Sequence, residues 1–120
     1  MINMSLKKVF IISFSVLSFS ASAQNQVPKD FLIKQCRDLS EHIKLLVVNQ
    51  GKKPCVEKLG LASEQLVSAA YLIDNDQYPN AKHELDNAVY TLQYAELSSC
   101  NHYIQISQSK FEAQKIKNYL

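Results

Sequence analysis

Three prolines, at positions 28, 54 and 79, divide the chain into segments whose apolar residues recur at helical spacing. In the first segment these residues follow one another at steps of three or four; they are Leu32, Cys36, Leu39, Ile43 and Leu46. Because such steps place side chains on one face of a helix, we expect a helix over about residues 30–49. Similar stripes run through residues 55–73 and 81–95. Each follows a proline, which suits the first turn of a helix.

The C-terminal stretch leaves two interpretations open. It contains neither Gly nor Pro after Pro79, and the polar residues 98–101 interrupt the helical pattern only weakly. The third helix either turns near Asn101 or continues. We expect a turn and a loosely packed or frayed fourth helix, because its stripe is thin: Ile106, Ala113, Ile116 and Leu120. Since short connections favour antiparallel neighbours, the predicted fold is all-α, a small antiparallel up-down bundle of three to four helices.

The first 23 residues have the pattern of a secretory signal peptide. Lys7 and Lys8 precede an apolar run, and the small residues Ala21, Ser22 and Ala23 follow it as a cleavage pattern. The apolar run is shorter than the roughly 20 residues needed to span a bilayer. We therefore expect cleavage after Ala23, which leaves residues 24–120 as a single helical domain in the periplasm or outside the cell.

Export also changes the charge of the chain. Lys7 and Lys8 are two of its 13 basic residues, so 11 remain in the mature chain against 11 acidic residues. A chain with no net charge has no overall field that would attract a polyanion, and we expect no nucleic-acid partner.

Three cysteines, Cys36, Cys55 and Cys100, lie in the mature part of the chain, and an oxidising compartment favours a bond between two of them. In an antiparallel hairpin centred at about residue 76, Cys55 is level with about residue 97, close to Cys100. A turn at about residue 51 separates Cys36 from Cys55 by roughly 18 Å along the axis, beyond the reach of a disulfide. We predict a Cys55–Cys100 disulfide. Cys36 is then a core residue or, as the alternative, an intermolecular bridge.

The predicted helices do not bring side chains suited to catalysis or metal binding together at one place. The predicted helices put His42, His83 and His102 at different heights, and no His-x-x-x-His or Glu-x-x-His pair is present. The chain also lacks the Cys-x-x-Cys-His motif of covalent haem and the Gly-x-Ser-x-Gly turn of serine hydrolases. We therefore expect no catalytic residues, no metal and no cofactor, and we do not expect an enzyme.

Charge is distributed unevenly within the predicted bundle. Five basic residues fall at the end that carries the first hairpin turn: Lys44, Lys52, Lys53, Lys58 and His102. The helix that follows Pro54 would present free backbone N–H groups at the same end. This end is a candidate site for an anionic lipid, such as a phosphoinositide, or for a phosphate. The alternative is a solvated turn whose lysines contribute only solubility.

Two tyrosines, Tyr90 and Tyr94, are one turn apart and lie off the apolar stripe of the third predicted helix. They form either an exposed aromatic patch, of the kind enriched at protein interfaces, or a contact with the fourth helix. An exposed patch would serve to bind a protein partner or a second copy of the chain.

In signal, size and composition the chain resembles small exported helical-bundle proteins of Gram-negative bacteria, including type II secretion substrates of intracellular pathogens such as Legionella. The resemblance implies a secreted factor that acts on host membranes or proteins. We expect an exported, non-enzymatic protein that binds a protein partner or itself. The alternative function is binding of an anionic lipid or a phosphate through Lys52, Lys53 and Lys58.

The signal-peptide assignment predicts the N-terminus of the exported protein. When the full chain is expressed in a Gram-negative host, the protein recovered from the periplasm or the medium should begin at Gln24. N-terminal sequencing and intact mass measure this directly. An exported protein that still carries residues 1–23 would contradict the assignment.

Overall fold

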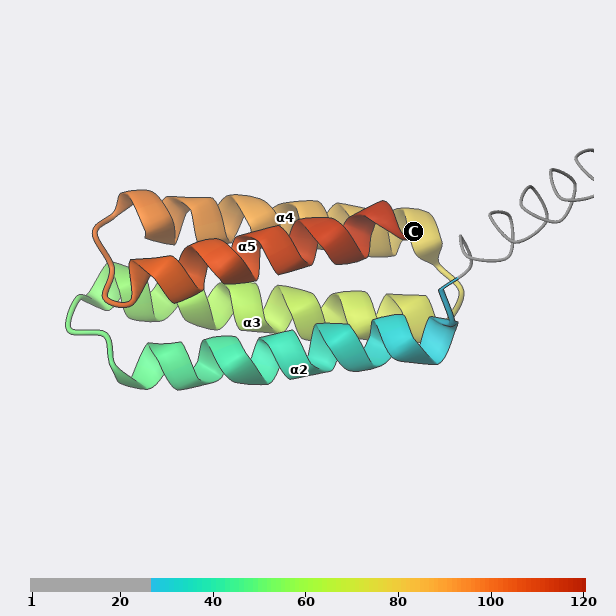
Figure 1. Cartoon of the computed structure of the whole chain (residues 1–120), viewed down its shortest axis with the longest axis horizontal. Coiled ribbons are helices and arrows are strands. Elements are labelled where there is room, and N and C mark those ends of the chain that lie inside the picture. Colours follow the sequence, from blue (N-terminus) through green and yellow to red (C-terminus); the bar gives the residue numbers. More distant parts are fainter. Residues whose placement is uncertain (1–26) are drawn as a thin grey trace, which may run out of the picture.

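The computed structural model describes residues 27–120, so the predicted signal segment lies outside the described residues. Four helices follow one another (Figure 1): α2 (Lys29–Val48), α3 (Lys53–Asp74), α4 (Tyr78–Leu97) and α5 (Tyr103–Asn118). Over residues 27–120 no strand forms, which confirms the all-α prediction. None of these four helices is both long enough and apolar enough to cross a membrane.

The helices pack as an antiparallel up-down bundle. Helix α3 lies between α2 and α4, and α5 runs back along α4 and closes the bundle against α2 (Figure 1). The sequence left open whether the third helix turns near Asn101. The structure answers this, because α4 ends at Leu97 and residues 98–102 reverse the chain. Left-handed backbone conformations at Ser99 and His102, with φ of 57° and 61°, make the reversal possible.

A single apolar core runs through all four helices. The predicted stripes of the first three helices are buried, and Leu59, Leu66, Leu85 and Leu92 are fully enclosed. Small side chains are also fully buried on α3 and α4, at alanines 62, 69, 70, 81, 88 and 95. Since the distance between two helices depends on the side chains at their contact, these alanines allow α3 and α4 to approach closely.

Helix α5 packs more firmly than its thin stripe suggested. Ile106 and Ala113 are fully buried and Ile116 is 1% exposed. Two ion pairs also join α5 to α4, one between Lys110 and Glu96 at 3.0 Å and one between Lys117 and Asp86 at 2.7 Å. The expectation of a loosely packed or frayed fourth helix is therefore wrong, because contacts with α4 that periodicity does not reveal hold it in place.

A pair of buried serines connects α2 with α3. The Ser40 hydroxyl donates to the Ser63 carbonyl at 3.0 Å, and the Ser63 hydroxyl donates to the Ser40 carbonyl at 3.1 Å. Buried polar groups are costly unless they are hydrogen-bonded, and this reciprocal arrangement satisfies both hydroxyls inside the core.

One end of the bundle is closed by a disulfide. Cys55, in the first turn of α3, is bonded to Cys100 in the α4–α5 loop, which confirms the predicted pairing. The same two loops are joined by hydrogen bonds, since the Gln50 side chain donates to the Asn101 carbonyl at 2.9 Å and accepts from the Asn101 N–H at 2.8 Å. We call this region, residues 45–58 and 94–104, the stapled end.

Replacing Cys55 and Cys100 together by serine should lower the free energy of unfolding by at most about 4 kcal/mol, because the bond restricts the unfolded chain over 45 residues. Urea denaturation of the parent and the double variant measures the loss. The stability of the parent should fall under reducing conditions, while that of the variant should not respond. A Cys36–Cys55 bond in a non-reducing peptide map would contradict the hairpin register.

Cys36 is the remaining thiol, and it is buried in the core as predicted. Burial raises the pKa of the Cys36 thiol from 9.0 to about 12. We therefore expect iodoacetamide to modify Cys36 rapidly in urea and very slowly in native buffer, as mass spectrometry would measure. Above pH 9 the unfolded chain loses this proton and the folded chain retains it, so the contribution of Cys36 to stability should fall as pH rises. Rapid modification in native buffer would show that Cys36 is not enclosed.

Candidate functional site

The five predicted basic residues lie at or near the stapled end, but they do not surround one point. Lys44 pairs with Glu41, one turn back in α2, at 3.1 Å. Lys53 lies 3.9 Å from Glu57, one turn further along α3, and both side chains are well exposed. These two lysines therefore have carboxylate neighbours on their own helices, which reduces the charge they offer to a ligand.

Lys58 connects the two surfaces that the sequence singled out. Its Nζ lies 4.7 Å from the ring centre of Tyr94 on α4, which is within cation–π range. Tyr94 is half exposed, and Tyr90, one turn before it, is 71% exposed. The exposure of both rings favours the interpretation of an aromatic patch over that of a contact with α5.

A small hollow of about 230 Å³ lies between the two loops of the stapled end. Of the predicted basic residues, Lys52 alone lines it, while His102 is exposed in the neighbouring loop. Lys52 is also the N-cap residue of α3 and makes no side-chain capping hydrogen bond. The hollow is lined by Gln50, Gly51, Lys52, Cys55, Ser99, Cys100 and Asn101.

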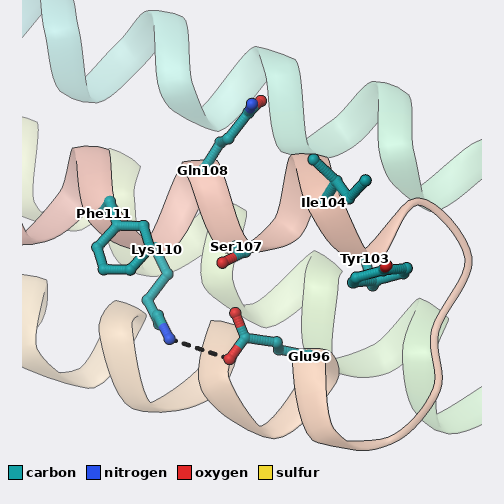
Figure 2. A pocket seen from close by; sticks show the side chains of 7 residues that line it. All are labelled: Glu96, Tyr103, Ile104, Ser107, Gln108, Lys110 and Phe111. Carbon is teal, nitrogen blue, oxygen red and sulfur yellow. Dashed lines mark hydrogen bonds and ion pairs between the residues drawn. The ribbon is translucent and has the colours of Figure 1, made fainter.

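A wider hollow of about 530 Å³ opens along the outer side of α5, beside the end of α4 (Figure 2). Three of its lining side chains are large, apolar and more than half exposed: Tyr103, Ile104 and Phe111. The remaining lining residues are Glu96, Ser107, Gln108 and Lys110. We call this feature the α4–α5 hollow.

An ion pair forms the polar side of the α4–α5 hollow (Figure 2). Lys110 Nζ lies 3.0 Å from Glu96 Oε1, and the two side chains are only 16% and 21% exposed. Hydrogen bonds from Lys110 and then from Ser107 lower the pKa of the Glu96 carboxyl below its usual value. Lys110 Nζ also lies 5.0 Å from the ring centre of Phe111. Glu96, Lys110 and Phe111 are therefore already positioned by contacts within the protein.

Sequence reasoning missed the α4–α5 hollow. Its apolar members lie outside the buried stripe of α5, and that stripe was the signal used to place the helix. The available signal was the seven-residue spacing of Ile104 and Phe111, which puts them on one outer face two turns apart.

The three histidines remain apart, as the predicted heights indicate. His42 lines a third hollow, of about 350 Å³ between α2 and α5, together with Asp38 and Glu112. His83 lies on α4, and His102 precedes α5 at the stapled end. In the part of the chain that the structure describes, no group of three His, Cys, Asp or Glu side chains is placed to hold a metal ion.

Comparisons of the chain with protein-family models, with curated proteins and with solved structures found no match. The assignment of a site consequently depends on two features of the chain itself, the α4–α5 hollow and the stapled end.

Proposed function

We propose that the protein is an exported, non-enzymatic helical bundle that binds a protein partner through the α4–α5 hollow. The observation that carries this proposal is the grouping of Tyr103, Ile104 and Phe111 around a positioned ion pair. Aromatic side chains are enriched at protein interfaces, and an exposed apolar cluster with a polar rim is typical of an interaction site.

The chemistry of the α4–α5 hollow favours recognition by shape and apolar contact. Glu96 and Lys110 neutralise each other, so the hollow carries little net charge. Ile104 and Phe111 offer apolar area two turns apart, while Gln108 between them can donate and accept hydrogen bonds. A partner helix with apolar side chains at helical spacing would fit this arrangement.

Export supports a partner outside the cytoplasm. The Cys55–Cys100 disulfide is consistent with an oxidising compartment. The signal pattern of residues 1–23 would carry the chain to the periplasm or the medium. With the resemblance to type II secretion substrates, this favours a secreted virulence factor whose partner is a host protein.

A binding role is further supported by the groups available in the α4–α5 hollow. None of its lining residues is a histidine, and its carboxylate and its lysine are engaged with each other. The Ser107 hydroxyl is hydrogen-bonded to Glu96, and the hydrogen bond from Lys110 lowers the pKa of that carboxyl, which makes it a weaker general base for a serine nucleophile.

Photo-crosslinking tests the α4–α5 hollow directly. A photoreactive amino acid at Gln108, which is exposed and lines the hollow, should trap a discrete adduct when the mature protein is incubated with host-cell extract. The matched control carries the same amino acid at Glu64, which is exposed on α3, a helix that does not pack against α5. Denaturing electrophoresis and mass spectrometry identify the adducts.

Replacing Ile104 and Phe111 together by serine should reduce the Gln108 adduct about tenfold or more, because apolar anchors contribute most of the binding free energy of an interface. The circular dichroism spectrum of the variant should match that of the parent, since both side chains are exposed. An adduct that survives this double substitution, or that forms equally from Glu64, would reject the α4–α5 hollow as the binding site.

A further inference from the structure

Exposed apolar side chains are concentrated at the stapled end. Among the described residues, nine large apolar side chains are more than half exposed, and six of them lie within one turn of this end. We call these six the apolar girdle: Leu45, Val48, Tyr94, Leu97, Tyr103 and Ile104. At the opposite end, Tyr71 alone meets the same criterion. Helix geometry does not require such an asymmetry, because each of the four helices buries side chains near both of its ends.

The apolar girdle has the depth of an interfacial membrane site. Its members come from the last turns of α2 and α4 and from the first turn of α5. One helical turn rises about 5.4 Å along the axis. Interfacial proteins bury their apolar side chains about 5–10 Å into the boundary between headgroups and acyl chains. A bundle that stands with its stapled end on a bilayer could therefore insert the whole girdle at one depth.

Positive charge accompanies the apolar girdle. Lys52 and Lys53 begin α3 at this end, and Lys58 lies one turn further along the helix. Two carboxylates lie among the described residues of the stapled end: Glu57 is 3.9 Å from Lys53, and Glu96 is paired with Lys110. Lys52 and Lys58 have no carboxylate partner among the ion pairs of the described residues. The stapled end thus offers lysines beside apolar side chains, a combination that complements anionic headgroups above an acyl layer.

The stapled end is also rigid enough to present this surface without rearrangement. The Cys55–Cys100 bond and the hydrogen bonds between Gln50 and Asn101 join its two loops. The contact between Lys58 and Tyr94 holds one girdle ring against α3. A surface that is ordered before binding loses less conformational entropy on binding.

We propose that the stapled end docks on an anionic lipid surface, with the apolar girdle inserted at the interface and Lys52 and Lys53 at the headgroups. The occupant is a membrane surface and not a free phosphate, because isolated phosphate would leave the six apolar side chains exposed. This inference does not require the protein partner proposed above. Tyr103 and Ile104 belong to both surfaces, whereas Phe111 and Gln108 line the α4–α5 hollow and lie outside the girdle.

Vesicle flotation tests the inference with the mature protein. The protein should float with vesicles of phosphatidylcholine and phosphatidylglycerol in equal parts, and much less with phosphatidylcholine alone. Lys52→Ala with Lys53→Ala should lower partitioning to the anionic vesicles about fivefold for each lysine. Val48→Ser with Leu97→Ser should lower it about tenfold or more, because these side chains would no longer insert.

Two matched controls remove the same types of side chain elsewhere. Lys82→Ala with Lys115→Ala removes two exposed lysines away from the stapled end, and Tyr71→Ser with Tyr90→Ser removes two exposed apolar side chains. Both control variants should float as the parent does. The same result is expected for Phe111→Ser, which alters the α4–α5 hollow and leaves every residue of the girdle in place. Equal losses in the controls and in the stapled-end variants would overturn the inference, as would flotation that is unchanged by all of these substitutions.

Other ligands give different outcomes in the same experiment. Full competition by inorganic phosphate would indicate a discrete anion site and would overturn docking on a surface. If Val48→Ser with Leu97→Ser abolished the Gln108 adduct and left flotation intact, the girdle would belong to the protein interface, which would also overturn it.

The orientation of the bound protein can also be measured on the parent chain, without any substitution, by NMR with spin-labelled lipids. Lipids that carry a nitroxide in the upper acyl chain should broaden the amide NMR signals of Gly51 and Asn101 at the stapled end. They should leave those of Asn75 and Asp76, in the α3–α4 turn at the opposite end, sharp. Broadening at Asn75 and Asp76 instead would place the wrong end on the membrane.

Discussion

The Cys55–Cys100 bond joins the two loops at one end of the bundle, and the arrangement of that end follows from it. The bond ties the first turn of α3 to the loop that leads into α5. The start of α3 and the start of α5 are therefore held at the same height along the bundle. A domain of this size encloses a modest core, and a covalent link compensates for that limit. Hydrogen bonds between Gln50 and Asn101 extend the link across both loops. With this support the stapled end can leave large apolar side chains in solvent.

The side chains that meet between helices differ on the two sides of α4, and the α4–α5 hollow lies on the side where long side chains meet. Fully buried alanines lie in the core where α3 and α4 meet. Between α4 and α5 the contact includes the long side chains of Glu96 and Lys110. Long charged side chains keep helix axes further apart than alanines do. The outer face of α5 consequently presents an open surface with an ion pair on one side and apolar groups on the other.

The two proposed surfaces adjoin each other, because Tyr103 and Ile104 belong both to the α4–α5 hollow and to the apolar girdle. A protein that filled the hollow would cover part of the girdle, and a bilayer that took up the girdle would cover one end of the hollow. If both surfaces are used, binding of the protein partner would lower the affinity for the membrane, and binding to the membrane would lower the affinity for the partner by the same factor. Phe111 and the lysines at the start of α3 are the positions that separate the two roles.

Periodicity and turn residues were sufficient to determine the first three helices, their buried faces and the Cys55–Cys100 pair, whereas the turn near Asn101 was left open. These are local properties, because a stripe of apolar residues must face a core and a short turn sets the register of the helices it joins. The tertiary structure alone decided how α5 packs and where exposed apolar side chains meet. Lys110 reaches Glu96, and Lys58 reaches Tyr94, across helix boundaries. The environment of a residue outside the stripe depends on which helix lies beside it, and no spacing along one helix encodes that neighbour.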